Sequence, residues 1–493
     1  MDDRASFPQV DRTNTYQTRG ARRRRQAWVA LLGATLTLAT VLLVWGTAPG
    51  GRTADPLPGA ATSLLGSPTE GGADTDAPGL PAGPDRLLVY QPHELKLDTT
   101  PTGATARLRL LDGTVAWEGP TPATIEAPGG PLVLEVAHDS CNPLSTRLTL
   151  DRDRSLELYL DPQGLLHRSI GRFATGSNPK QVAFTPDNRE IWASLLGGSG
   201  VQVFDAVTLE KLADIDLGDH GSVEVIFTRD GATAFASQME SASVFEIDRA
   251  TRTVRRRLRT EGVWTKIIAL SPDERTLYAA NWSSDDVSEI DLPTGSVRRR
   301  LPTVRTPRGL YVTPDGSSLY VAGFENGDIA RIDLTTGEST TLITTGGAMR
   351  HLVGDGRFLY ADDMALDKVY VVNLSTDEVR EFAQTNEKPN TIDLTPDGRV
   401  LYVSNRGENG ASYYLPGPEW GSVVAIDTAT GAVLDGIVGG NQCTGLDVSP
   451  DGRTLAFSDF LDNRVRLYAI PDYETLVAGA GGRAVAHLAD IRK

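Results

Sequence analysis

The sequence predicts an all-β fold in which a seven-bladed β-propeller follows a small β-sandwich and one N-terminal transmembrane helix. Three observations carry this prediction. A short turn motif recurs seven times toward the C-terminus, apolar and polar residues alternate between turns, and one apolar run near the N-terminus has the length of a membrane span. Alternation with a period of two is typical of half-buried strands. Units of about 40 residues built from such strands indicate propeller blades.

The composition of the 493-residue chain excludes several classes of protein. Its 48 basic and 64 acidic residues give a net charge of −16, whereas nucleic-acid binding needs a basic surface for the phosphates. Cys141 and Cys443 are the two cysteines, and neither belongs to a haem-attachment or zinc-binding spacing. We therefore expect no nucleic-acid partner, no cofactor and no metal.

The apolar run at 27–45 begins and ends near tryptophans, Trp28 and Trp45. Nineteen helical residues span about 28 Å, close to the hydrocarbon thickness of a bilayer. Four arginines close the preceding tail (1–26), so the positive-inside rule places that tail in the cytoplasm. We expect a single-pass protein of the plasma (inner) membrane with its remainder periplasmic or extracellular. The alternative is a cleaved signal peptide, which has a shorter apolar core.

The segment 46–85 holds 9 glycines and 7 prolines in 40 positions and no aromatic residue. Such a composition cannot bury a core, so we expect a disordered linker. Residues 86–162 differ, because short alternating runs are separated by Gly and Pro turns. We expect a small antiparallel sandwich there, with strands that include 95–98, 106–110, 132–136 and 156–160.

This segment resembles the PEGA domain, a small extracytoplasmic β module. The matching motifs are Pro101–Ala104, Asp112-Gly113 and Gly119–Pro122, and the match fails at Cys141-Asn142, where the domain has a glycine–aromatic pair. The resemblance implies an adhesive or spacer role without catalytic residues.

The segment 163–493 carries the repeats. Each turn holds an aspartate, at positions 187, 230, 273, 315, 355, 397 and 451, with spacings of 43, 43, 42, 40, 42 and 54. A strand precedes each turn, a second follows it, and a third ends in Asp before a fourth. The second strands with their preceding turns, such as Leu277–Asn281, Leu319–Gly323 and Leu401–Asn405, resemble the YVTN family of seven-bladed propellers. This resemblance implies the fold and leaves the activity open.

The ring needs a strand that joins its two ends. Residues 165–174 look like a fourth strand without a blade before it, and we expect them beside 467–470. The alternative closing segment is the tail at 473–477.

Residues seven positions before the turn aspartates fall where each first strand begins, around the central channel. Three of them are basic, Lys180, Lys266 and Arg308, and two more blades have Asn390 and Thr444 there. Clustered positive charge in a cleft attracts anions, so we expect Lys180, Lys266, Arg308 and Asn390 to bind an anionic ligand. The alternative is that carboxylates such as Glu224 neutralise them.

The long spacing of 54 reflects an insertion at 405–421 in the sixth blade. It contains Tyr413, Tyr414 and Trp420, and aromatic residues in exposed loops often anchor a partner. We expect these three residues to bind a partner, unless they cover the barrel rim.

Two further patterns of charged residues have both a structural and a functional interpretation. Acidic or amide residues recur between second and third strands, where they would form turns or hold calcium: Asp285-Asp286, Asn326, Asp328, Asp362-Asp363, Asp367 and Asp462-Asn463. Arginine runs at 255–259 and 298–300 lie on predicted outer strands, where they would block edge pairing or contact anionic lipid or polymer.

The resulting hypothesis is a membrane-anchored extracytoplasmic binding or scaffold protein of the cell envelope. Its propeller, expected to be monomeric, would recognise an envelope protein, a polymer or a small anion. The alternative is an enzyme of the lactonase-like or metal-dependent kind that other seven-bladed propellers exemplify. The candidate acid–base pool is small, namely His220, Glu224, His351 and Asp393, and none of these forms a known motif. His351, beside Arg350, is either in the channel or packed.

Overall fold

Residues 91–481 and 490–493 are described by a computed structural model of the chain. Strands make up nearly all of the regular structure in this part, with the short helix α2 (Tyr473–Gly479) as an exception. Within the same residues, no helix has the length and apolar character needed to cross a bilayer. The predicted tail (1–26), membrane span (27–45) and linker (46–85) lie outside the described residues.

Seven strands form a small two-sheet domain at the start of the described chain. They are β1 (His93–Thr100), β2 (Thr105–Leu110), β3 (Val115–Pro120), β4 (Ala123–Ala127), β5 (Gly130–Ala137), β6 (Leu144–Leu150) and β7 (Arg154–Tyr159). One sheet has the order β4-β1-β7 and the other β3-β2-β5-β6. Buried residues alternate with exposed ones along β1 and β5, and the inward leucines share one core.

The expectation of purely antiparallel pairing in this sandwich is wrong. Strands β1 and β7 pair in parallel, with Leu97 opposite Leu156. A parallel pair needs a long crossover connection, and the strands from β2 to β6 supply it. Local alternation therefore predicted the strands but carried no information on the direction of this long-range pair.

Seven four-stranded sheets follow in the described residues. Their strands are β9 (Pro179–Phe184), β10 (Glu190–Leu195), β11 (Gly200–Asp205), β12 (Lys211–Asp216); β13 (Ser222–Phe227), β14 (Thr233–Gln238), β15 (Ser243–Asp248), β16 (Thr253–Arg259); β17 (Thr265–Leu270), β18 (Thr276–Asn281), β19 (Asp286–Asp291), β20 (Ser296–Pro302); β21 (Pro307–Val312), β22 (Ser318–Gly323), β23 (Asp328–Asp333), β24 (Ser339–Thr344); β25 (Met349–Gly354), β26 (Phe358–Asp363), β27 (Lys368–Asn373), β28 (Glu378–Gln384); β29 (Pro389–Leu394), β30 (Val400–Asn405), β31 (Ser422–Asp427), β32 (Val433–Val438); and β33 (Cys443–Val448), β34 (Thr454–Asp459), β35 (Arg464–Ala469) with β8 (Arg168–Ala174).

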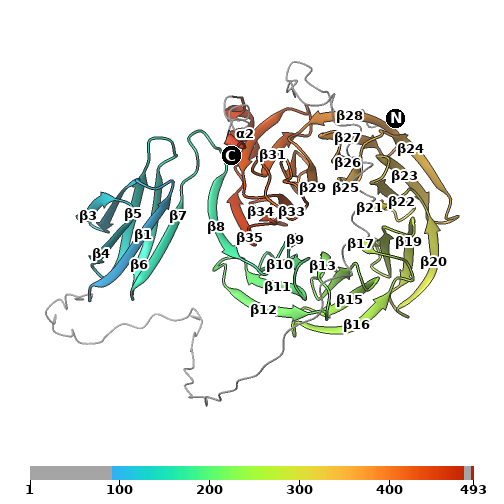
Figure 1. Ribbon diagram of the computed structural model, residues 1–493, viewed down its shortest axis with the longest axis horizontal. Coiled ribbons are helices and arrows are strands. Elements are labelled where there is room, and N and C mark those ends of the chain that lie inside the picture. Colours follow the sequence, from blue (N-terminus) through green and yellow to red (C-terminus); the bar gives the residue numbers. More distant parts are fainter. Residues whose placement is uncertain (1–90, 482–489) are drawn as a thin grey trace, which may run out of the picture. The chain divides into compact units, whose positions relative to one another are not determined.

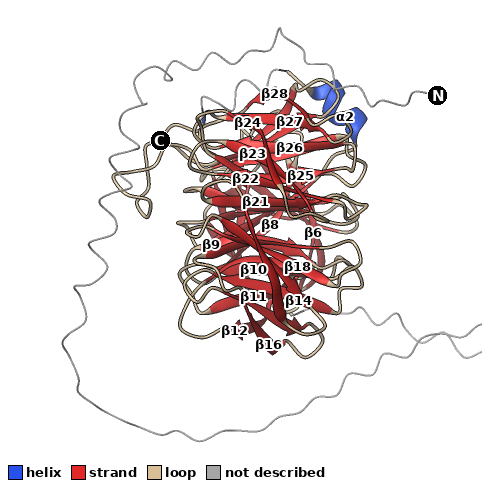
Figure 2. Ribbon diagram, turned by 90° about the vertical axis from the view of Figure 1, so that its right-hand side faces the viewer, coloured by secondary structure: helices blue, strands red, loops and turns tan. Residues whose placement is uncertain are grey.

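These sheets are the blades of a propeller. They follow one another around a ring, and the first strand of each blade is innermost (Figure 1). Neighbouring innermost strands contact each other all the way round, including β33 with β9. Seen from the side, loops gather at the two faces of the ring and strands lie between them (Figure 2). The second residues of the innermost strands therefore surround one central channel.

The last blade is assembled from both ends of the propeller segment. Strand β8 pairs antiparallel with β35 as its outermost strand. The expected closure by 165–174 is thus confirmed. The alternative closing segment forms helix α2 instead, which Asp472 caps by accepting a hydrogen bond from the backbone of Thr475. Leu476 of this helix is buried in the core of the last two blades.

A buried cluster fixes the segment that leads into β8. We call His167, Asp435 and Tyr402 the closure cluster. Asp435 Oδ2 accepts hydrogen bonds from Nδ1 and the backbone N–H of His167 and from the backbone N–H of Leu166, at 2.7 to 3.1 Å. The Tyr402 hydroxyl lies 2.8 Å from Nε2 of His167. These contacts attach the start of the propeller segment to the sixth blade.

The recurring turn has a chemical explanation. In the first blade, the Thr185 hydroxyl donates to Asp187 Oδ1 at 2.7 Å and accepts from the backbone N–H of Glu190 at 3.0 Å. The same Ser/Thr–Asp bond recurs in five other blades. The residue after the aspartate adopts a left-handed conformation, with φ of 67° at Gly231, which favours glycine. The fifth blade lacks the hydroxyl, and its turn is shorter.

Hydrophobic cores lie between adjacent blades. One core joins Phe358, Tyr360 and Phe382 of the fifth blade to Ile392 and Leu401 of the sixth. Another joins the first blade to the last across the closure. Because each sheet packs against its neighbours, the blades hold their innermost strands in fixed register around the channel.

Candidate functional site

The second residue of each innermost strand occupies an equivalent place around the channel. Four of these residues are basic, and in chain order the seven are Lys180, Val223, Lys266, Arg308, Arg350, Asn390 and Thr444. The structure thus brings the predicted Lys180, Arg308 and Asn390 to one cavity, together with Arg350. Lys266 interacts electrostatically with Arg308 and Arg350 in the same region.

Arg350 and Arg406 complete the set of basic groups, and counting back from the turns missed both. The turn of the fifth blade is two residues shorter, so Arg350 lies five rather than seven positions before Asp355. Arg406 follows β30, at the start of the insertion, and is 2% exposed. We call Lys180, Lys266, Arg308, Arg350 and Arg406, with the nearby carboxyl groups of Glu224 and Asp362, the channel cluster. Strand alignment would have revealed Arg350 from the sequence.

Neutral groups, not carboxylates, hold the basic side chains in place. Lys266 Nζ lies 3.3 Å from the ring centroid of Trp282, and Lys180 Nζ lies 5.5 Å from that of Phe460. Arg350 donates to the backbone oxygen and Oδ1 of Asn390, at 2.6 and 2.8 Å. Aromatic faces attract cations without neutralising them. The positive charge of these groups therefore stays available to a ligand.

Arg406 is held in the same manner. Its guanidinium carbon lies 4.0 Å from the ring centroid of Tyr413, and it donates to the side-chain oxygen of Gln442. Tyr413 also accepts a long hydrogen bond, 3.4 Å, from Lys180. One insertion tyrosine thus contacts two cations of the cluster.

Arg308 has no hydrogen-bond partner among the described residues. It is 5% exposed, and its buried Nη1 makes no hydrogen bond. Nε of Arg406 and Nδ2 of Asn390 are buried and unpartnered as well. Buried polar groups are hydrogen-bonded as a rule, and each exception needs an explanation. These three donors lie in the channel cluster or its lining and would suit an anion, and one acceptor of the cluster, Asp362 Oδ2, is unpartnered as well.

The two carboxyl groups of the cluster form no ion pair with its basic groups. In the described part of the chain, no basic nitrogen lies within 4.0 Å of a Glu224 or Asp362 oxygen in an ion pair. Burial raises the pKa of Glu224 to about 7, although Arg308 and Lys180 oppose this. Burial also raises the pKa of Asp362 to about 7, against the effect of Arg350. The alternative that Glu224 pairs with the basic ring is not what the structure shows.

Burial and nearby charge also shift the pKa of the two lysines. Burial, and then the charges of Arg350 and Arg308, holds the pKa of Lys180 well below its usual range. Burial and the same two arginines lower that of Lys266. Bringing an anion to the cluster would raise the pKa of both lysines again, because opposite charge favours the ionised form.

The channel is narrow at the level of the basic ring. The cavity between Lys180, Glu224, Arg308 and Arg350 has a volume of about 10 Å³, about the room of one water molecule. An organic ligand would therefore approach the ring end-on from the channel mouth, which we define as the end where the innermost strands begin.

Aromatic and other apolar residues surround this mouth. The residues that follow the second strands are, in blade order, Leu196, Met239, Trp282, Phe324, Met364, Arg406 and Phe460. Trp282 packs against Phe324 with ring centroids 4.9 Å apart. Across the insertion, Tyr413 and Tyr414 pack against Phe460. Trp264 and Tyr414 remain 45% and 58% exposed. The mouth thus has an apolar rim above a basic floor.

The three predicted partner residues have different surroundings. Tyr413 contacts Arg406 and Lys180 of the channel cluster, whereas Tyr414 is exposed together with the neighbouring Leu415. Trp420 lines a separate surface pocket of about 380 Å³ with Arg464 and Arg466. The Lys493 ammonium lies 4.4 Å from its ring centroid. The insertion therefore does not present these aromatic residues as one surface.

The candidate acid–base residues do not all lie in one site. Glu224 and His351 line the same cavity, and burial with Arg308 and Arg350 lowers the pKa of His351 to about 3. His220 is exposed and does not line this cavity. Asp393 accepts from the backbone of Leu394 and Val448, and burial raises its pKa to about 6 beside a second carboxyl group, Asp447.

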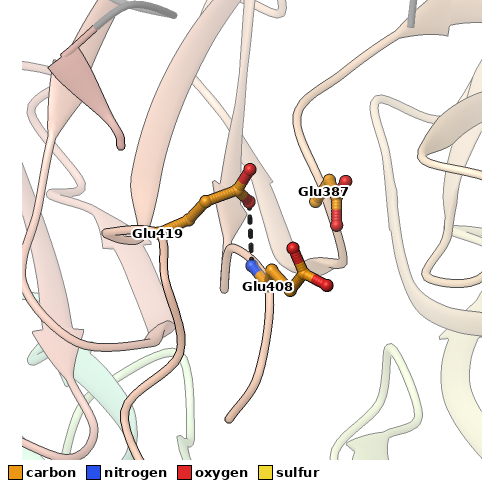
Figure 3. A group of neighbouring side chains, drawn as sticks. All are labelled: Glu387, Glu408 and Glu419. Carbon is orange, nitrogen blue, oxygen red and sulfur yellow. Dashed lines mark hydrogen bonds between the residues drawn. The ribbon is translucent and has the colours of Figure 1, made fainter. Parts of the chain in front are cut away.

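The acidic residues between second and third strands mainly support turns. Asp363 Oδ1 accepts from the backbone N–H groups of Ala348 and Ala365, and Asp285 accepts from that of Thr306. A different group, Glu387, Glu408 and Glu419, brings carboxylate oxygens within 4.8 Å of one another (Figure 3). Glu419 accepts from the backbone N–H of Glu408 at 3.0 Å, so this group also has a structural use in the insertion.

The arginine runs on the outer strands are paired within the propeller. Arg256 and Arg299 each bond a glutamate of their own blade, at 2.6 Å, and donate to a backbone oxygen of the next blade, Leu292 and Leu334. Arg298 and Arg300 pair with Asp291 and Asp286. These contacts favour a structural role for the runs.

Comparisons with known proteins support the fold and provide a relative. No known protein-family profile matches the chain. Hydrazine synthase of Kuenenia stuttgartiensis is similar in structure, with a TM-score of 0.53 and 19% identity over 60% of this chain and 97% of that chain. This likeness supports a propeller-type repeat fold alone.

The sequence comparison goes further. Antigen Lp49 of Leptospira interrogans (serogroup Icterohaemorrhagiae, serovar copenhageni) is 36% identical over 326 residues, which cover 63% of this chain and 71% of the antigen. The aligned length exceeds that of the small sandwich several-fold, so it must include much of the repeat region. At this identity and coverage, the chain belongs to the same protein family as antigen Lp49.

Proposed function

We propose that the protein is an extracytoplasmic binding protein whose propeller recognises an anionic ligand at the channel mouth. One observation carries the proposal: five basic side chains converge there without carboxylate partners, and Arg308 is buried with no hydrogen bond to its Nη1. An unpaired buried charge is costly. An anion would supply the missing acceptors and offset that cost.

Further parts of the proposal concern location and partners. The chain would be anchored in the plasma membrane through 27–45, with residues 1–26 in the cytoplasm. Its repeats would be of the YVTN type and its sandwich of the PEGA type. A relative named an antigen fits a protein exposed outside the cytoplasm. The exposed tip of the insertion, Tyr414 and Leu415, would contact an envelope protein or polymer from a monomeric propeller.

Calorimetric titration of the full-length protein with acetate, citrate, sulfate and phosphate at low ionic strength tests the core of this proposal. We expect at least one anion to bind, and Arg308→Met to weaken it about tenfold or more, because a charge-assisted hydrogen bond is lost. Arg305→Met is the matched control. Arg305 lies in the same blade but is exposed and paired with Glu325.

Two results would count against the proposal. The first is that none of the four anions binds. The second is that Arg305→Met weakens binding as much as Arg308→Met, because the effect would then be general electrostatics. Thermal unfolding of both variants checks that the fold is intact.

An enzyme remains the second candidate, on the observation that burial raises the pKa of Glu224 to about 7 beside basic groups. A general base works best with a pKa near the operating pH. Lactone substrates would fit the lactonase-like alternative. Glu224→Gln should then abolish hydrolysis of a lactone panel, and an absence of hydrolysis by the unmodified protein excludes that chemistry.

A further inference from the structure

The geometry points to a more specific ligand: we propose that the channel mouth binds the doubly charged, tetrahedral oxyanion group of a phosphate monoester, end-on. This inference rests on the proposed anion-binding function and adds the chemical class of the ligand.

The first argument is the number of charges. The five basic groups of the channel cluster are opposed by the carboxyl groups of Glu224 and Asp362 and, at Lys266, by that of Glu240, so basic groups exceed these acidic groups by two. A single carboxylate would compensate only half of this excess. A phosphate monoester carries close to two negative charges near neutral pH, which matches the excess more closely.

The second argument is the direction from which the donors come. The basic groups of the ring belong to the first, third, fourth and fifth blades, and Arg406 adds one from the sixth. A carboxylate is planar, and one guanidinium fork satisfies both of its oxygens. Donors arranged around an axis suit a group whose terminal oxygens point in three directions, as in a tetrahedral oxyanion.

The third argument is the shape of the mouth. The ring leaves about 10 Å³, so the charged group must stop at the level where Lys180 and Lys266 lie against Phe460 and Trp282. The remainder of the ligand would then lie along the apolar rim, where Trp264 and Tyr414 are 45% and 58% exposed. An ester with an organic part fits this arrangement better than inorganic phosphate does.

Calorimetric titration of the full-length protein with phenyl phosphate, inorganic phosphate and benzoate tests the inference. We expect phenyl phosphate to bind about tenfold or more tightly than benzoate, which has the same ring and one charge fewer. Titration in buffers of different ionisation enthalpy should show proton uptake with phosphate, since a bound anion raises the pKa of the buried lysines and carboxyl groups around it. A purely structural cluster would give no such uptake.

Two variants locate the effect. Lys266→Met should weaken the binding of both phenyl phosphate and inorganic phosphate, and it should reduce the proton uptake. Tyr414→Ala should reduce the preference for phenyl phosphate over inorganic phosphate. Binding of the protein to phosphatidylcholine vesicles, with and without phosphatidic acid, identifies the source of the phosphate group. Vesicle binding that depends on phosphatidic acid indicates a lipid phosphate. Binding of phenyl phosphate without vesicle binding indicates a soluble phosphate monoester.

The outcomes separate this inference from the proposed function. If benzoate binds as tightly as phenyl phosphate, the phosphate assignment is wrong and the anion-binding function stands. If citrate and the other anions of the first experiment also fail to bind, both are wrong. If phosphate binds equally well to Lys266→Met and to the unmodified protein, its site lies elsewhere and the inference is overturned.

Discussion

The channel cluster and the closure cluster are both buried in the propeller, and their charged groups have opposite environments. In the closure cluster, Asp435 Oδ2 accepts three hydrogen bonds, two of them from His167. In the channel cluster, four of the five basic groups contact amides, aromatic rings or a backbone oxygen, and the buried Nη1 of Arg308 makes no hydrogen bond. The first arrangement holds two segments together, whereas the second leaves charge without a partner.

This difference indicates how to separate structural from functional charge in the fold. A buried pair contributes to stability only if its partners remain together, and removing one partner is strongly destabilising. An unpaired cluster contributes little to stability and should tolerate neutralisation. Substitutions in the two clusters should therefore have opposite effects on the folding free energy.

The largest effect is expected in the closure cluster. Asp435→Ala removes the acceptor for three donors, and we expect a loss of about 3 kcal/mol or more in the free energy of unfolding. Denaturant unfolding of the full-length protein measures this change. A loss below about 1 kcal/mol would mean that the cluster is not what attaches β8 to the sixth blade.

The next effect compares the clusters directly. Asn390→Asp is nearly isosteric and places a carboxylate 2.8 Å from Nη2 of Arg350. It gives the channel cluster the kind of partner that the closure cluster has. We expect a higher melting temperature together with anion binding about tenfold weaker, because the new carboxylate competes with the ligand. Reduced stability with unchanged binding would contradict the view that the cluster lacks an acceptor.

The last effect concerns pH. Burial raises the pKa of Glu224 from its ordinary value of 4.5 to about 7 in the folded protein. The folded state therefore holds a proton that the unfolded state has released between these two values. The contribution of Glu224 to stability should be present below about pH 4.5 and lost as the pH rises to about 7. Comparing the pH-dependent stability of Glu224→Gln with that of the unmodified protein measures this contribution.

The same group should affect binding. Glu224 faces Arg308, Lys180, Arg350 and Asp447, and its ionisation adds negative charge beside the ligand. The affinity for sulfate, whose charge is constant over this range, should fall from pH 6 to pH 8, and Glu224→Gln should reduce that fall. The lysines and Asp362 would cause the remaining dependence. If Glu224→Gln has the same pH dependence of anion affinity as the unmodified protein, Glu224 does not interact electrostatically with the bound anion.

The sequence predicted those features that local pattern determines. Turn aspartates and alternating residues indicated the repeated four-stranded units and the equivalence of Lys180, Lys266, Arg308 and Asn390. Features that depend on distant contacts were not predictable in this way. Arg350 was missed because one turn is shorter, and Arg406 because it stands outside a strand. The parallel pairing of β1 with β7 and the different surroundings of Tyr413, Tyr414 and Trp420 depend on tertiary contacts.

The pairing of β8 with β35 has a consequence for the order of assembly. Arg168 of β8 pairs with Ala469 of β35, so β8 leaves the ribosome long before its partner strand is synthesised. It can pair with β35 only after the intervening blades have been made. Bringing such distant segments together is slow. Until then, β8 of one molecule could pair with β35 of another, which is a route to domain swapping. Refolding of the protein should therefore produce more dimers as its concentration rises, and the exchanged element would be β8.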